Sequence, residues 1–137
     1  MTETFTGRTI AEGRSEGSVL LSPDPVSFYG AVDIETGEFI EEDHPLEGTN
    51  IAGRVLVFPK GKGSTVGSYV LYGLAQEGTA PAAMVIQEAE TIVATGAILG
   101  EIPCVDGIAD ATDSFQDGDR VRVDATAGTI ERLEDGE

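Results

Sequence analysis

RVLVFPKGKGSTVGSYVLYGLAQEG, residues 54–78, combines three signals of one fold class in a single stretch. Residues 54–58 are mostly aliphatic and stop at a proline, which cannot continue a strand ladder, so they predict a buried β-strand. Residues 68–76 carry apolar side chains at helical spacing, and Gly78 supplies a helix stop. Strand, glycine-rich turn and helix together predict an α/β domain.

Other short apolar runs bounded by glycine or proline recur along the chain, which contains 18 glycines. Their length and composition are typical of further buried strands. They are GSVLLSP (17–23), AAMVIQ (82–87) and IPCVDG (102–107). The chain is therefore expected to be rich in sheet, with few helices.

The C-terminal part predicts a hairpin and the middle predicts a second helix. Residues 119–133 alternate apolar and polar side chains on both sides of a turn at Ala127 and Gly128. A helix is expected in EAETIVATGAI, from Glu88 to near Gly96. With 137 residues, the chain is long enough for one ordinary core. We expect a single domain over residues 1–137, with frayed tails at about 1–5 and 133–137.

The chain is strongly acidic, with 25 acidic and 8 basic side chains and a net charge of −17. Repulsion between like charges opposes binding to nucleic acids or anionic membranes. The acidity is interpreted as a solvated surface of the kind adapted to high salt, where screening makes a large charge tolerable. The N-terminus has no signal-peptide pattern, and no apolar stretch approaches the ~20 residues of a membrane span. A cytoplasmic location is therefore expected.

Metal ligands are scarce, because the chain has one cysteine, Cys104, and one histidine, His44. A single thiol cannot form an internal disulfide, and it cannot hold an iron–sulfur cluster or a structural zinc alone. Cys104 lies in an apolar run and is interpreted as a core residue, and His44 precedes a proline and is interpreted as a loop anchor. Residues 33–44 are acidic, but their spacing does not fit a calcium loop. No metal is predicted on this chain.

Both lysines of the chain, Lys60 and Lys62, lie in the glycine-rich turn just before Ser64. A strand end followed by a helix N-terminus presents backbone N–H groups and a favourable dipole to anions. The P-loop requires Ser or Thr directly after its lysine, but Gly63 follows Lys62, and the glycine spacing does not fit a dinucleotide fingerprint either. The pattern therefore predicts an anion site that is not a nucleotide site. The alternative is a turn whose lysines only increase solubility.

Three longer stretches resemble the aconitase X swivel-domain family: SFYGAVDIETG (27–37), residues 44–86 and GAILGEIPCVDG (96–107). The resemblance runs in the same order from about Gly7 to Gly128. It implies a swivelling β/β/α domain, similar to the mobile last domain of aconitase, that docks on a separate large aconitase X-type subunit. It also implies a hydro-lyase active only as this heterodimer. The implied reaction is dehydration of (R)-5-phosphomevalonate to trans-anhydromevalonate 5-phosphate in the archaeal mevalonate pathway.

The resemblance also implies roles for residues of the glycine-rich turn. In aconitases a G-x-G-S-S-R segment of this domain supplies the catalytic serine, and residues 61–65 match its start. Ser64 is thereby implied as the proton acceptor, with Lys62, Gly63 and Thr65 as substrate-binding residues. Val66 stands where the motif has arginine. The resemblance therefore implies that Lys62 or residues of the partner replace the arginine in binding the substrate carboxylate. The implied cofactor is an iron–sulfur cluster on the large subunit, as the Lewis acid for the leaving hydroxyl.

Two alternatives to this function stay open from the sequence. Within the family, the chain is a subunit of a hydroxyproline-type or another hydroxy-acid dehydratase, since substrate choice depends largely on the large subunit. In a different class, it is a non-catalytic module that binds an anion or a partner. Retained activity after replacement of Ser64 favours the non-catalytic module, and the genes beside that of the large subunit distinguish the two dehydratases.

Overall fold

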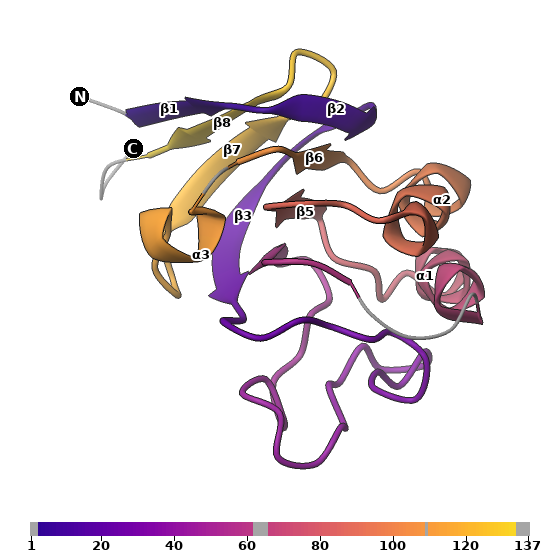
Figure 1. Cartoon of the computed structure of the whole chain (residues 1–137). Helices are drawn as coiled ribbons and strands as arrows, with labels where there is room; N and C mark the ends of the chain where they lie inside the picture. The colour runs from indigo at the N-terminus through magenta and orange to yellow at the C-terminus, as the bar shows by residue number, and fades with distance from the viewer. Residues whose placement is uncertain (1–2, 62–65, 109, 134–137) are drawn as a thin grey trace.

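The computed structural model describes residues 3–61, 66–108 and 110–133 (Figure 1). These residues form one eight-stranded sheet and three helices. The strands are β1 (Glu3–Thr6), β2 (Arg8–Ala11), β3 (Arg14–Leu21), β4 (Val55–Phe58), β5 (Ala83–Ile86), β6 (Cys104–Asp106), β7 (Arg120–Asp124) and β8 (Thr129–Arg132). The helices are α1 (Val66–Glu77), α2 (Thr91–Gly100) and the short α3 (Ala111–Ser114).

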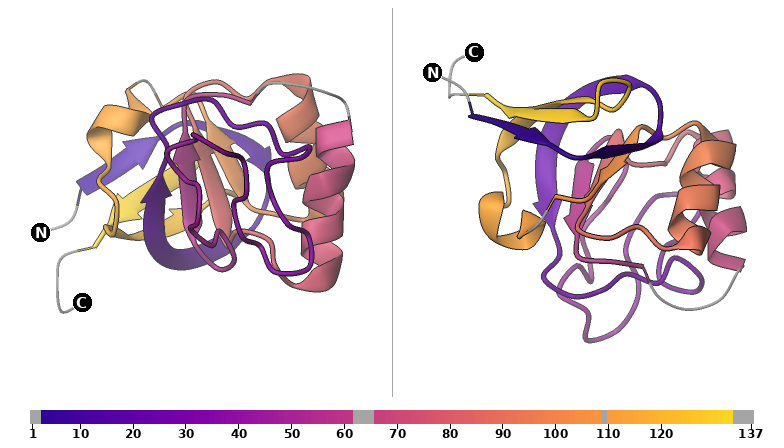
Figure 2. Two further views of the ribbon diagram at one scale, coloured as in Figure 1. Left: turned by 90° about the horizontal axis from the view of Figure 1, so that it is seen from below. Right: turned by 45° about the horizontal axis from the view of Figure 1, so that its top comes forward.

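The strand order is β1-β8-β7-β3-β4-β5-β6-β2, and β3 to β6 are parallel to one another. β1 and β2 lie at the two ends of this order but are joined through Gly7, so the sheet closes on itself (Figure 2). At the closure the Gly7 amide donates to the Gly128 carbonyl at 2.8 Å. A Cβ on Gly7 would lie 2.3 Å from the Asp106 carbonyl oxygen, so only glycine fits there.

The two ends of the chain differ from the sequence expectation of frayed tails at 1–5 and 133–137. Residues 3–5 belong to β1, which pairs with β8 in antiparallel register. Phe5 packs against Phe115, with ring centroids 4.7 Å apart. Leu133 is buried, and its amide donates to the Arg120 carbonyl at 2.8 Å. Phe5 packs against the core inside the closed sheet, and Leu133 is buried and bonded to the backbone of Arg120, so both ends are ordered this far.

Two hydrophobic cores lie on opposite faces of the parallel strands. Along β4, Val55 and Val57 belong to the core inside the closed sheet, and Leu56 and Phe58 belong to the core under the helices. β5 alternates in the same way, and every residue of both strands is buried. Burial on both faces explains why these strands appear as unbroken apolar runs in the sequence. The resulting layers, sheet, sheet and helices, confirm the β/β/α fold that the resemblance implies.

The two long helices pack side by side on the outer face of the parallel strands (Figure 1). The prediction that the second helix ends near Gly96 was wrong, because α2 continues to Gly100 and Glu101 forms a left-handed C-cap with φ 55°. Gly96 is instead a packing residue. A Cβ there would lie 2.5 Å from Leu71 Cδ1 on α1, so its absence permits the close approach of the helices.

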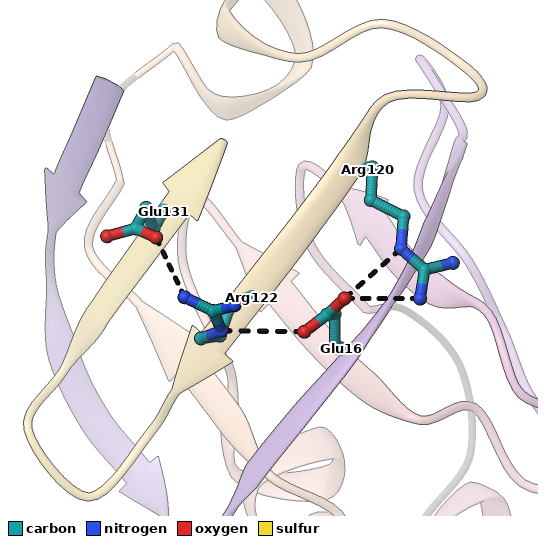
Figure 3. Close-up of polar contacts among 4 residues, drawn as sticks. All are labelled: Glu16, Arg120, Arg122 and Glu131. Carbon is teal, nitrogen blue, oxygen red and sulfur yellow. Dashed lines mark hydrogen bonds and ion pairs between the residues drawn. The ribbon is translucent and has the colours of Figure 1, made fainter. Parts of the chain in front are cut away.

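The predicted hairpin is confirmed by the pairing of β7 with β8, in which Val123 lies opposite Ile130. On the outer face of this part of the sheet, charged side chains form a network (Figure 3). Glu16 of β3 lies within 3.2 Å of Arg120 and 3.4 Å of Arg122, and Arg122 continues to Glu131 at 3.0 Å. Exposed pairs of this kind contribute up to about 1 kcal/mol each. This face, on the far side of the sheet from α1 and α2 (Figure 1), is a solvated surface.

Candidate active site

The candidate site lies where the carboxyl ends of β4, β5 and β6 meet and where α1 and α2 begin. In α/β folds, both open sheets and barrels, ligand sites lie at the carboxyl ends of the parallel strands. The four residues predicted for the site, Lys62, Gly63, Ser64 and Thr65, follow β4 and precede α1 in the chain but lie outside the described residues. The structure therefore defines the site through its flanks, from Pro59 to Gly61 and from Val66 onward.

The chain leading into the site is held by backbone hydrogen bonds on both sides. The Val26 amide donates to the Lys60 carbonyl at 3.1 Å, and Gly61 forms an isolated parallel bridge with Val26. From the other side, the Glu88 amide donates to the Pro59 carbonyl at 3.1 Å. The segments around Val26 and Glu88 therefore hold the backbone of residues 59–61, which directly precedes residue 62.

Gly61 lies against the N-terminus of α2 without room for a side chain. A Cβ at this position would lie 2.4 Å from Val93 Cγ2 and 2.8 Å from Glu90 Oε1. The Glu90 carboxylate caps α2 by accepting from the amides of Val93 at 2.8 Å and Ile92 at 3.1 Å. The α2 N-terminus is thus satisfied by its own chain, and it also fixes where Gly61 can lie.

Sequence analysis gave no sign of the role of Glu90. Thr91 follows it, and threonine is the stronger capping residue in general preference. The contact between Gly61 and Glu90 joins segments that are 29 positions apart, so no local pattern reveals it.

Lys60 is exposed at this edge. Within the part of the chain that the structure describes, it takes part in no ion pair, whereas five of the six arginines do. α1 has no acidic residue in its first turn. Among the described residues, no acidic side chain forms an ion pair with Lys60, and the anion site stays a prediction.

Asp106, which sequence analysis missed, organises the same edge at the end of β6. Its side chain is 3% exposed and accepts from Arg8 Nε at 2.9 Å, from an Arg8 terminal nitrogen at 2.8 Å and from the Ala89 amide at 3.0 Å. The hydrogen bond with Asp106 raises the pKa of Arg8. The hydrogen bond from the Ala89 amide to Asp106 holds the β5–α2 connection against β6. No local pattern could have revealed it, because Arg8 and Asp106 are 98 positions apart.

The single histidine and the single cysteine have structural roles, as predicted. His44 is buried, with Nε2 3.1 Å from the Pro25 carbonyl and Nδ1 accepting from the Leu46 amide at 3.1 Å. Both ring nitrogens are thus engaged with the backbone, so His44 is a loop anchor and not a general base. Cys104 is fully buried in β6, and burial together with the charge of Asp106 raises the pKa of its thiol. A thiol in this environment is a poor nucleophile.

Among residues 3–61, 66–108 and 110–133, no three His, Cys, Asp or Glu side chains are grouped so that they could hold a metal ion. Cys104, the single thiol of the chain, cannot hold an iron–sulfur cluster alone, and it is buried. The residues of this chain therefore do not fit such a cluster. None of the helices in the described part of the structure has the length and apolar character needed to cross a bilayer.

Comparisons with known proteins give one consistent family. The family model described as "Aconitase X swivel domain" matches residues 4–132. The phosphomevalonate dehydratase small subunit of Thermococcus kodakarensis is 53% identical over 131 residues, covering 96% of this chain and 97% of the relative. The protein of the same name from Methanosarcina mazei is 54% identical over 134 residues, covering 97% and 93%.

The fold agrees with a solved structure of the same kind. A crystal structure of Thermococcus kodakaraensis aconitase X in its holo form matches with a TM-score of 0.93 and 51% sequence identity. The match covers 96% of this chain and 99% of the matching chain. Sequence and structure agree over nearly the whole length, and the chain belongs to the aconitase X swivel-domain family.

Proposed function

We propose that this chain is the small subunit of a phosphomevalonate dehydratase, a hydro-lyase of the archaeal mevalonate pathway. The reaction removes water from (R)-5-phosphomevalonate and gives trans-anhydromevalonate 5-phosphate. The observation that carries the proposal is the identity of about one half, over nearly the full length of both chains, to small subunits of that name. Exposed Lys60, which forms no ion pair with another described residue, is compatible with an anionic substrate.

A large aconitase X-type subunit completes the enzyme as a heterodimer in this proposal. Dehydration of a β-hydroxy acid breaks a C–H bond beside the carboxylate and a C–O bond at the next carbon. The leaving hydroxyl is stabilised by a Lewis acid. An iron–sulfur cluster on the large subunit would supply that Lewis acid in this proposal, since the single, buried thiol of this chain does not fit one.

In this scheme Ser64 accepts the proton that leaves the carbon beside the carboxylate. A serine is a weak base unless its oxyanion is stabilised by nearby donors and positive charge. Lys62, the backbone of Gly63 and Thr65 serve as the substrate contacts. In support of this scheme, the backbone of residues 59–61, which directly precede Lys62 in the chain, is held from both sides by hydrogen bonds.

The function is tested by reconstitution from separately purified subunits. We expect this chain with its large subunit to convert (R)-5-phosphomevalonate to a product lighter by one water, measured by mass spectrometry, and either subunit alone to be inactive. Turnover of a hydroxyproline or of an unphosphorylated hydroxy acid in place of phosphomevalonate would assign the alternative dehydratase. A complex without any dehydratase activity would favour the non-catalytic binding module.

Replacing Lys62 with glutamine is expected to raise KM about tenfold in the reconstituted enzyme. One charge-assisted contact to the substrate contributes at least about 1.5 kcal/mol, and 1.4 kcal/mol corresponds to a factor of ten. Lys60→Gln is expected to have a smaller effect, because Lys60 lies farther from Ser64 in the chain. Steady-state kinetics at low and high salt provide the measurement.

Arg120→Gln is the matched control for both lysines. It removes the same positive charge, but on the outer face of the sheet, where Arg120 pairs with Glu16 (Figure 3). KM should stay within about twofold in this variant, since the charge is remote from the site. If neither lysine variant changes kcat/KM, the lysines only make the turn soluble and the anion site is wrong.

A further inference from the structure

We propose that a pocket between β2 and the last turn of α2 binds a primary alkylammonium group. The pocket has a volume of about 340 Å³, which lies in the usual range of small-molecule sites. It is lined by three apolar residues, Ile10, Ala11 and Ile98, and by two acidic residues, Glu12 and Glu101. We call it the β2–α2 pocket. The proposed dehydration makes no use of it.

The β2–α2 pocket lies at the opposite end of α2 from the candidate active site. α2 begins beside Gly61 at the carboxyl edge of the parallel strands and ends at Gly100. Its 10 residues, at a rise of 1.5 Å each, place about 15 Å of helix between that edge and the pocket. A ligand in the pocket therefore occupies a different place from a substrate at the carboxyl edge.

The apolar part of the pocket provides a surface that an alkyl chain can cover. Ile98 lines the pocket and is 59% exposed, whereas Ala11 is buried and Ile10 packs against the core under the helices. Methylene groups lying against Ile98 would remove apolar surface of both the ligand and the protein from water. This contact favours an organic ligand over a hydrated ion.

The acidic part of the pocket is not neutralised within the described residues. Neither Glu12 nor Glu101 takes part in an ion pair there. Arg8 and Arg14, the arginines nearest to Glu12 in sequence, pair instead with aspartates of β6 and β7. A cation that enters the pocket would meet two carboxylates without displacing a described arginine from either of them.

The end of α2 adds a further feature that favours a cation. The carbonyl groups at a helix C-terminus carry a negative partial charge, which a nearby cation stabilises. The last turn of α2 contains no basic residue that could serve this purpose. The positive head of a ligand in the pocket would lie close to this helix end.

These features together distinguish an alkylammonium group from other ligands. Two carboxylates and a helix C-terminus repel an anion. A bound Ca²⁺ or Mg²⁺ ion takes about six or more oxygen ligands, and no three acidic, His or Cys side chains are grouped for a metal in the described part of the chain. An ammonium head on an alkyl chain matches both the charged and the apolar parts of the lining.

Glu101 stands in a conformation that glycine would adopt more easily. It is the C-cap of α2, with φ 55° and ψ 40° in the left-handed region, where glycine or asparagine is usual. Glycine avoids the steric cost of a Cβ in this region. A carboxylate at a position where glycine would be more stable is expected of a residue that binds a ligand.

The proposal is tested by an NMR titration of the isotope-labelled, full-length chain at low salt. The probe is 1,4-diaminobutane, a four-carbon chain with an ammonium group at each end. We expect saturable shifts of the methyl signals of Ala11 and Ile98. Ammonium chloride at the same ionic strength is the control for diffuse counterions, since the chain has a net charge of −17. It should not reproduce these shifts, because it lacks the alkyl chain.

Glu12→Gln/Glu101→Gln removes both carboxylates from the pocket and keeps the size of the side chains. This variant should bind 1,4-diaminobutane at least tenfold more weakly. Glu42→Gln/Glu47→Gln removes the same charge from the β3–β4 connection, which lies away from β2 (Figure 1). The control variant should bind within twofold of the wild type.

Glu101→Gly separates binding from folding. Its melting temperature should rise by about 3 °C, because glycine relieves the left-handed conformation. Its affinity for 1,4-diaminobutane should nevertheless fall at least threefold. If the double glutamine variant melts more than about 5 °C below the wild type, Glu101→Gly alone carries the test.

Three results would overturn the proposal. They are equal binding by the wild type and the pocket variant, equal weakening by the control variant, and equal shifts with ammonium chloride. A competition experiment then identifies the source of the ammonium group, and this step alone rests on the proposed function. If saturating 1,4-diaminobutane weakens binding of the purified large subunit at least tenfold, the group is a lysine side chain of that subunit. Unchanged affinity for the large subunit assigns the pocket to a free amine.

Discussion

Ser64→Ala is expected to lower the kcat of the reconstituted dehydratase about 1,000-fold and to leave KM within about twofold. A positioned general base contributes about 10²–10⁴-fold to a rate, and alanine removes the only oxygen of the side chain. The substrate would still be held by its charged groups, so ground-state binding should change little. An equal fall in kcat and kcat/KM indicates that the lost interaction exists only in the transition state. Initial rates at saturating (R)-5-phosphomevalonate measure this directly.

Ser18→Ala makes the same chemical change away from the site. Ser18 lies on β3 opposite Arg120, on the part of the sheet that bears the charge network. Its kcat and KM should match those of the wild type. Binding of Ser64→Ala to the large subunit, measured by calorimetry, should also be unchanged, which separates loss of chemistry from loss of assembly. Wild-type kcat in Ser64→Ala would remove this residue from the mechanism and favour a non-catalytic role for the chain.

The elements that could be predicted from the sequence are those buried on both faces or alternating strictly. β4 and β5 appear as continuous apolar runs because one face lies in each core. The β7–β8 hairpin alternates because Val123 and Ile130 face inward while Arg122 and Glu131 pair outside. In each case the local sequence carries the same information as the packed structure.

The elements that could not be predicted depend on contacts between distant parts of the chain. β1 and β2 are short and largely polar, and they become strands only because β8 and β6 offer edges on both sides of Gly7. In the local sequence Gly96 looks like a helix stop, but in the structure its missing side chain leaves room for Leu71 of α1. Helix propensity disfavours glycine by about 1 kcal/mol, and close packing of two helices outweighs that cost.

For the candidate site, the sequence predicts a position but not the residues that support it. A strand end, glycines and two lysines before a helix predicted its position at the carboxyl edge of the sheet. The roles of Lys62, Gly63, Ser64 and Thr65 stay predictions. The supports at Glu90 and Asp106 were missed, because a side chain that braces a remote segment has no signature in its own neighbourhood. Sequence patterns show which residues are chemically suitable, while the packing around them determines where they are held.

The packing around Gly61 leaves no room for a side chain at this position. Gly61→Ala is expected to lower the free energy of unfolding by about 2–4 kcal/mol. Overpacking costs about 1–3 kcal/mol, and displacing the Glu90 carboxylate would cost about 1 kcal/mol more through loss of the α2 cap. The new methyl group would lie 2.4 Å from Val93 Cγ2 and 2.8 Å from Glu90 Oε1. Chemical denaturation of the isolated chain measures the effect.

The same substitution should lower kcat/KM about 100-fold at a temperature where the variant stays folded. Gly61 is the last described residue before residues 62–65, which carry the predicted site. A shift of about 1 Å in a reacting group can lower the rate by that factor. Gly67→Ala is the matched control, since its new methyl group would meet its nearest neighbour, Ile92 Cγ2, at an ordinary 3.4 Å. Alanine there should be neutral or stabilising by up to about 1 kcal/mol, because it lies within α1.

Adding Val93→Ala to Gly61→Ala tests whether the contact with α2 is the cause. Val93→Ala alone should destabilise the chain, because it empties a buried site. The double variant lacks Val93 Cγ2, so the new methyl group at residue 61 no longer clashes with it. Its loss of stability should therefore be at least about 1 kcal/mol smaller than the sum of the two single losses. Partial recovery of kcat/KM should accompany the recovered stability, since both depend on the position of residue 61. If the two losses of stability simply add, the N-terminus of α2 does not position the residues of the predicted site. The same holds if Gly61→Ala is as stable and as active as the wild type.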